Sequence, residues 1–302
     1  MTAHFYILAE SFRYNNSLSS EEIEEKVMRL SEDLSHINKY KDTNKLYVNY
    51  DEIYPQLFYS HFTIQDFICT PQVLKREGID RDIINALQRI FEKAESTPIT
   101  SQEVKNDLLS WIDENDCHGI IAFHKIKDMD DSVQIVYGID GWYKFRRHFL
   151  GIYPKEADFF LDECKKYFPK LYFHDRNKDT IKTILKDCPK KIIFHLSALN
   201  DIFNQCIQDG LNRTQILQQF SIKANLDETA SLEGDASRKE NFTFEFVNDA
   251  GVKENVCCEP HLKLCYSDNN TSYSTNRRIY FHEGKTNIQN GSILIGHIGT
   301  HL

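Results

Sequence analysis

The sequence predicts an α+β protein in two parts: a mixed α/β N-terminal domain over residues 1–175, then helices and an antiparallel sheet over residues 176–302. Three observations predict this class. Capping boxes open helices between short apolar segments in the first half. Apolar residues at helical spacing precede the C-terminal run 242–302. In that run apolar and polar residues alternate with a period of two, between turn dipeptides such as Asn290-Gly291. Helices followed by antiparallel strands are the order of an α+β unit.

The N-terminal half alternates short strands with capped helices. Ser19 and Glu22 form a capping box before an apolar stripe at helical spacing, and Thr100 and Glu103 form a second one. Because two helices are bracketed by strands, we interpret this half as a mixed α/β domain and not as a parallel nucleotide-binding one, and no glycine-rich phosphate loop occurs. Short apolar segments predict strands at residues 5–8, 46–48, 119–124 and 133–139, the last two joined by the acidic loop 128–131.

The middle of the chain is dense in aromatic and basic residues over 141–153. Interleaved rings and cations can stack nucleic-acid bases. We favour the simpler interpretation, in which the rings pack in the core and the arginine stems lie on the surface. A polar loop without periodicity follows at residues 224–241, and its Ser231, Glu233 and Arg238 are candidates for an accessory site. Helical spacing predicts helices at residues 157–168, 178–187, 192–209 and 212–220.

The C-terminal run predicts a sheet with one apolar and one polar face. Phe242, Phe244 and Phe246 alternate with polar residues in its first strand. The apolar face is predicted to hold Leu262, Leu264, Ile279, Phe281, Leu294 and Ile298. The opposite face is predicted to hold His261, Lys263, Arg278, Tyr280, His282 and His297.

This polar face has the residue types needed to cleave RNA without a metal ion. The attacking 2′-hydroxyl needs a base to take its proton, and the leaving oxygen needs an acid to protonate it. The charge that develops on the phosphorane needs fixed cations to stabilise it. We expect Arg278 to hold the phosphate, Lys263 to stabilise charge, and Tyr280 to orient the substrate, with His261 or His297 as base or acid. Further cations are predicted to bind substrate around the same groove: Arg238, Arg277, His282 and Lys285.

Two other interpretations of the polar face stay open. The outer face of an antiparallel sheet is often polar only because water wets it. A metal site could also be assembled, although no close-spaced ligand pair marks one, and we therefore predict neither metal nor cofactor. The candidate ligands are His261, His282, His297 and Glu259.

Composition limits the function classes. The chain has 302 residues, 41% hydrophobic and 27% charged, as expected of a globular protein. No apolar run reaches the length of a membrane span, and the opening residues lack a signal-peptide pattern, so we expect a cytoplasmic protein. The formal net charge of −9 argues against nucleic-acid binding, because such proteins usually carry a basic excess. RNA binding therefore requires that cations converge locally.

The last two predicted strands carry a family resemblance. Arg278-Ile279-Tyr280-Phe281, followed by residues 293–297, resembles the closing strands of the RelE/ParE/HigB toxin superfamily. That resemblance implies a helical pair on a small antiparallel sheet, and a metal-independent ribonuclease or a gyrase poison. The sequence departs from the family at Ile298, where a basic residue commonly follows the histidine.

The whole chain is also similar to a group of uncharacterised prokaryotic proteins. In that group a His-x-Lys strand, an Arg-Ile-Tyr-Phe strand and a Gly-His-Ile-Gly-x-His-Leu ending recur, here at His261/Lys263, 278–281 and 296–302. This likeness implies a toxin or antiviral phage-defence setting. The sequence thus predicts a toxin-like or phage-defence ribonuclease. The alternatives are a non-enzymatic module that binds a protein partner, and a metal-dependent DNA nuclease using Glu259, Glu233 and Lys263.

Overall fold

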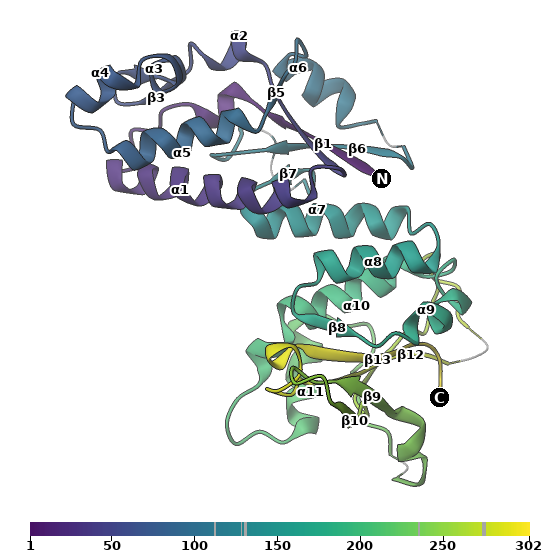
Figure 1. The fold of residues 1–302 in the computed structure, drawn as a ribbon. Coiled ribbons are helices and arrows are strands. Elements are labelled where there is room, and N and C mark those ends of the chain that lie inside the picture. The colour runs from purple at the N-terminus through teal and green to yellow at the C-terminus, as the bar shows by residue number, and fades with distance from the viewer. Residues whose placement is uncertain (112, 128, 130–131, 235, 274–275) are drawn as a thin grey trace. The chain divides into compact units, whose positions relative to one another are not determined.

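A computed structural model describes residues 1–302 apart from 112, 128, 130–131, 235 and 274–275. The predicted acidic loop at 128–131 therefore lies, except for Met129, outside the described residues. The chain folds into two compact units, Met1–Phe145 and Arg146–Leu302 (Figure 1). Within the described residues, no helix is both long enough and apolar enough to cross a membrane.

The first unit is built on a five-stranded sheet whose order is β5-β2-β1-β6-β7. Every pairing in this sheet is parallel. The predicted α+β class is confirmed, but the expectation that this half is not a parallel nucleotide-binding domain is wrong in its strand direction, because parallel pairing needs helical crossovers and not a glycine-rich loop. The strands are β1 (Thr2–Ile7), β2 (Asn44–Val48), β5 (Glu95–Ser96), β6 (Asp116–Ile121) and β7 (Ile135–Val136).

Helices α1 (Ser20–Ile37) and α5 (Arg81–Glu92) pack against each other in this unit. The predicted capping boxes are confirmed at Ser19 with Glu22 and at Thr100 with Glu103. The remaining elements are short: η1 (Ala9–Phe12), η2 (Asn38–Tyr40), α2 (Tyr50–Ile53), β3 (Leu57–Tyr59), β4 (Phe62–Thr63), α3 (Ile64–Cys69), α4 (Pro71–Arg76), α6 (Ser101–Glu103) and the π-helical turn η3 (Val104–Leu108).

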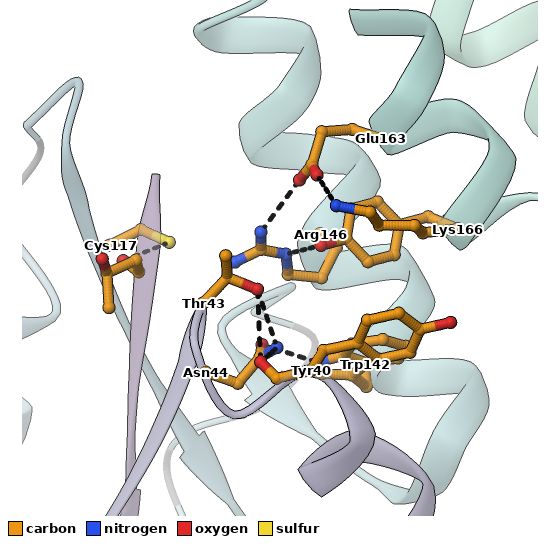
Figure 2. Close-up of polar contacts among 10 residues, drawn as sticks. Tyr40, Thr43, Asn44, Cys117, Trp142, Arg146, Glu163 and Lys166 are labelled. Carbon is orange, nitrogen blue, oxygen red and sulfur yellow. Dashed lines mark hydrogen bonds and ion pairs between the residues drawn. The ribbon is translucent and has the colours of Figure 1, made fainter. Parts of the chain in front are cut away.

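The aromatic and basic run forms helix α7 (Gly138–Ile152), in which the division between the units falls. In the first unit Trp142 is buried and donates from Nε1 to Asn44 Oδ1 at 3.1 Å (Figure 2). In the second unit Arg146 is buried beside Glu163, with 3.1 Å between Nη2 and Oε2 (Figure 2). Core packing of the rings is confirmed, but Arg146 and Arg147 are also buried, contrary to the expectation of surface arginines.

The second unit contains a four-stranded sheet in the order β11-β12-β13-β8. Strands β11 (His261–Lys263), β12 (Arg277–His282) and β13 (Ile293–Thr300) pair antiparallel, as predicted. Strand β8 (Leu171–Phe173) adds to β13 in parallel. The prediction divided the chain near residue 175, whereas the compact units divide at residue 145, because β8 belongs to the C-terminal sheet.

Helices cover one face of this sheet, and the hairpin of β9 (Thr243–Val247) and β10 (Lys253–Cys257) covers the other (Figure 1). The helix-covered side is the larger apolar core of the unit. The helical elements are α8 (Ala157–Tyr167), α9 (Asn177–Thr180), η4 (Ile181–Thr183), α10 (Pro189–Asp201), η5 (Phe203–Cys206), α11 (Arg213–Lys223), η6 (Ala236–Phe242) and η7 (Gln289–Gly291).

A bulge in β13 changes which side chains reach each core. Tyr280 pairs with His297 but Phe281 pairs with Ile295, so Gly296 is the extra residue. Five of the six predicted apolar-face residues lie in the helix-side core, but Leu294 packs with Phe242 on the hairpin side. The prediction for Leu294 was wrong because it assumed an unbroken period of two along the final strand.

Candidate functional site

His261, Tyr280 and His297 lie directly opposite one another on three adjacent strands. His261 pairs with Tyr280 across β11 and β12, and Tyr280 pairs with His297 across β12 and β13. Residues in register share one face of a sheet. The predicted convergence of these three residues is confirmed.

This row is buried and not wetted by solvent. The exposed fractions are 4% for His261, 0% for Tyr280 and 2% for His297. Phe242 stacks on Tyr280 with 6.1 Å between ring centroids and 4° between planes. The interpretation of the face as an ordinary wetted surface is therefore wrong for this row. Buried polar groups need partners, since leaving them unpaired costs about 1–3 kcal/mol each.

Glu233, from the polar loop after α11, supplies a shared partner. Its carboxylate accepts a 2.7 Å hydrogen bond from the Tyr280 hydroxyl. The same Oε1 lies 3.4 Å from His261 Nδ1 and 3.3 Å from His301 Nε2. Burial alone would raise the pKa of Glu233, but the hydrogen bond from Tyr280, and after it the neighbouring His261, His301 and Arg238 side chains, lower that pKa below its ordinary value. Glu233 is thus held as a carboxylate at the centre of the cluster.

Ser231 completes a short chain of contacts through His261. Its Oγ lies 3.0 Å from His261 Nε2, while Nδ1 of the same ring faces Glu233. The two backbones also exchange hydrogen bonds, of 2.9 and 3.2 Å. Burial lowers the pKa of His261 to about 4, an effect that Glu233 partly opposes. His261 is therefore neutral near pH 7 and can accept a proton from a hydroxyl group.

Arg278 and Lys263 form the neighbouring row, opposite each other on β12 and β11. Arg278 is only 9% exposed and donates from Nη1 to the backbone carbonyl of Arg277 at 3.0 Å. Its Nε is buried without a hydrogen-bond partner among the described residues. Lys263 lies 4.0 Å from Glu228, and both of these side chains are partly exposed. Arg278 thus retains a buried donor that an anion could satisfy.

Arg238 and His297 lie at the edges of the cluster. Arg238 Nη2 is 3.3 Å from His301 Nδ1, which places the predicted accessory arginine at the site. His297 Nε2 contacts the backbone carbonyl of Thr300 at 2.8 Å, so Nε2 must carry the proton. Burial lowers the pKa of His297 to about 4. His297 is therefore a neutral ring that donates to the backbone.

The structure does not bring three of the predicted substrate-binding residues to this cluster. Arg277 alternates to the other face and binds Asp187 at 2.9 Å. Lys285 lies 3.1 Å from Glu254. His282 is beyond the bulge, where its Nδ1 accepts a 3.0 Å hydrogen bond from the Gly284 amide. Strand alternation turns Arg277 away from Tyr280, whereas His282 and Lys285 lie beyond the cluster at and after the end of β12, and all three groups have local partners.

The candidate metal ligands are also dispersed. Glu259 lies 3.4 Å from Arg213 and not beside the histidine row. In the described part of the chain, no group of three or more His, Cys, Asp or Glu side chains is arranged to hold a metal ion.

The sequence interpretation missed the central place of Glu233 and the part played by His301. Glu233 lies in a segment without periodicity, so only its composition marked it as a candidate. His301 follows His297 by four residues at the end of a strand, which gave no indication of its partner. Comparison of the chain with protein families, curated proteins and solved structures gives no match.

Proposed function

We propose that the C-terminal unit is a metal-independent ribonuclease, of the kind used by toxins or in phage defence, that acts on RNA inside the cell. The observation that carries this proposal is the neutral His261 ring, with a hydroxyl on one nitrogen and a carboxylate on the other. A neutral imidazole oriented by a carboxylate is a general base.

In this proposal the 2′-hydroxyl of RNA takes the place of the Ser231 hydroxyl, 3.0 Å from His261 Nε2. His261 accepts the 2′-hydroxyl proton as the oxygen attacks phosphorus, and Glu233 stabilises the imidazolium that forms. The bond from phosphorus to the 5′-oxygen breaks, leaving a 2′,3′-cyclic phosphate and a 5′-hydroxyl. His301, which is partly exposed and contacts both Glu233 and Arg238, is placed to protonate the leaving oxygen.

The neighbouring cations support the same reaction. Arg278 has a buried Nε donor that a phosphate oxygen would satisfy, and Lys263 lies opposite it. Charge that develops on phosphorus is stabilised by such fixed donors. Of the two histidines considered as base, the geometry favours His261, because His297 Nε2 is already engaged by the Thr300 carbonyl.

The test is cleavage of a defined RNA by the purified full-length chain with EDTA present. His261→Asn and Glu233→Gln should each lower the cleavage rate by about 100-fold or more, the usual contribution of a general base. His61→Asn, an exposed histidine of the first unit, is the control and should cleave at the wild-type rate. Wild-type rates in His261→Asn, or the loss of all cleavage in EDTA, would contradict the proposal. Replacing His261, Lys263 and Arg278 together should likewise preserve RNA in cells.

One observation favours a second candidate function. Ser231 Oγ, His261 and Glu233 follow the order of a serine hydrolase triad, with Nε2 toward the hydroxyl and Nδ1 toward the carboxylate. Ser231 Oγ would attack the carbonyl carbon of an ester while its proton passes to His261 and then to the leaving alcohol. Water would hydrolyse the acyl-serine.

Ser231→Ala separates the two candidates. It should abolish hydrolysis of a p-nitrophenyl ester if Ser231 is the nucleophile. It should leave RNA cleavage largely intact if the 2′-hydroxyl of the RNA is the nucleophile. Substituting 2′-deoxy at the scissile position would stop only the ribonuclease reaction.

A further inference from the structure

The sheet of the first unit reverses its direction of growth between β1 and β6. The chain places β2 and then β5 on one side of β1, and β6 and then β7 on the other. In open parallel sheets, ligands bind outside the carboxyl ends of the strands at such a reversal. Here the carboxyl ends of β1 and β6 are joined by a 2.9 Å hydrogen bond from the His124 amide to the Ser11 carbonyl.

A cavity of about 270 Å³ lies at the carboxyl edge of this sheet, over the ends of β6 and β7 and so next to the reversal, with no lining residue from β1 among those described. Lys26 and Arg29 line it from α1, and Phe123 and Tyr137 line it just after β6 and β7. Pockets for drug-sized ligands usually measure about 300–1,000 Å³, so this cavity suits a small ligand better than a dinucleotide.

The cations of the cavity make no ion pair within the described residues, although the Glu22 carboxylate acts on Lys26 and the Asp33 carboxylate interacts with Arg29. Lys26 Nζ lies 2.8 Å from His124 Nδ1 and 5.1 Å from the centre of the Phe123 ring. Burial, with Lys26 itself, lowers the pKa of His124 to about 4, so His124 is a neutral acceptor. Within the described residues, no carboxylate oxygen lies within 4.0 Å of the Lys26 or Arg29 nitrogens. Two cations one helical turn apart therefore line the cavity without a close ion pair, and the Asp33 carboxylate lines it beside them.

Helix α1 also offers an acceptor, one turn beyond Arg29. Asp33 Oδ2 is buried with no hydrogen-bond partner in the described chain. A Cβ at Gly138, whose φ is +67°, would stand 2.9 Å from that oxygen, so a side chain there would crowd the carboxylate. Burial raises the pKa of Asp33, and the Ile139 amide and the Arg29 charge oppose that rise. A ligand hydroxyl or amino group could satisfy the remaining oxygen.

The N-terminus of α1 is unsuited to the anion. Ser19 and Glu22 already cap it, and Glu21 and Glu22 make its first turn acidic. Helix N-termini bind phosphate when their amides are open and their surroundings are not anionic. The negative charge of a ligand must therefore be bound by side chains of the second and third turns of α1, which carry Lys26 and Arg29.

We propose that this pocket binds a mononucleotide, with its phosphate on Lys26 and Arg29 and its base against the half-exposed ring of Tyr137. The two cations favour an anionic group, and the aromatic ring favours a planar group. The volume of the cavity suits a single nucleotide. This site lies in the first unit and does not depend on the ribonuclease proposal.

Calorimetric titration of the full-length chain with AMP, GMP, CMP and UMP tests the proposal, with inorganic phosphate as a fifth probe. At least one nucleotide should bind, and the double variant Lys26→Gln/Arg29→Gln should raise its Kd about ten-fold or more. The matched control, Lys39→Gln/Arg89→Gln, removes the same charge from residues that line a different cavity and should leave the Kd unchanged.

Three results would overturn the proposal: no heat from any nucleotide at millimolar concentration, equal weakening in both double variants, or phosphate binding as tightly as every nucleotide. Tyr137→Ala separates the base from the phosphate. It should weaken nucleotide binding and leave phosphate binding as it was, and an unchanged nucleotide Kd would count against the assignment of the base.

Discussion

The hydroxyl of Tyr280 donates a 2.7 Å hydrogen bond to the carboxylate of Glu233, 47 residues earlier in the chain. Tyr280 comes from the middle of β12, in the C-terminal sheet, and Glu233 from the polar loop that follows α11. This bond fixes the loop against the sheet, and it holds Glu233 Oε1 between the rings of His261 and His301. The chemistry proposed for the unit depends on that placement.

Tyr280→Phe should raise the pKa of Glu233. Without the phenol hydrogen bond, only His261, His301 and Arg238 would oppose the rise in pKa that burial causes. The loss of one buried hydrogen bond should also destabilise the fold by about 1–3 kcal/mol. The carboxyl ¹³C shift of Glu233, followed by NMR titration and assigned with Glu233→Gln, measures the pKa. An unchanged pKa in Tyr280→Phe would show that the phenol does not hold the carboxylate.

His297 should make the protein less stable in mild acid. Its pKa of about 4 in the folded state lies below its ordinary value of 6.5. The unfolded chain therefore binds more protons between these values, and stability falls as pH drops through 6.5 toward 4. The full loss is about 3 kcal/mol. Urea denaturation of wild type and His297→Gln at pH 7 and pH 4.5 should show a smaller drop in the variant. Equal drops would assign the acid sensitivity to other groups.

The sequence predicted the histidine row because strand alternation and register are local. Period two placed His261, Tyr280 and His297 on one face, and antiparallel pairing aligned them. The burial of that face was not predictable in the same way. It depends on Phe242, at the end of η6, and on the β9–β10 hairpin that follows it, which pack over the row, and such packing has no signature in residue spacing.

Two errors have different physical origins. Leu294 was assigned to the wrong face because the bulge at Gly296 breaks the period, and a single glycine in a strand does not by itself disclose a bulge. The parallel pairing of the first unit was missed because it does not need the glycine-rich loop that was looked for, and because its outer strands β5 and β7 are only two residues long. Their pairing is fixed by the tertiary structure and not by local propensity.

Gly296 should tolerate no side chain. A Cβ at this position would stand 2.3 Å from Cδ2 of Phe244 and 2.8 Å from Sγ of Cys258. Gly296→Ala should therefore destabilise the fold by about 1–3 kcal/mol, the usual cost of overpacking a core. Gly234→Ala is the control, since nothing lies within 4 Å of its Cβ position. Urea denaturation measures both variants, and Phe244→Leu should recover part of the loss in Gly296→Ala. A neutral Gly296→Ala would mean that the hairpin can move away from the sheet.

The buried carboxylate of Glu163 should be among the most sensitive positions in the second unit. Its Oε2 lies 3.1 Å from Nη2 of Arg146, whose Nε donates to the Tyr167 hydroxyl at 2.8 Å. Glu163→Leu leaves the guanidinium buried without this counter-charge, which typically costs about 3–5 kcal/mol. Lys166→Met is the matched control, because Lys166 binds the same carboxylate at 2.6 Å but is partly exposed.

The control should lose no more than about 1 kcal/mol, since solvent screens an exposed ammonium group. Both free energies of unfolding can be measured by urea denaturation at pH 7. Equal losses in the two variants would show that Arg146 draws its stabilisation from other neighbours and that its pairing with Glu163 adds little. A large difference would identify the Arg146–Glu163 pair, and not the net charge of the helix, as what holds α7 and α8 together within this unit.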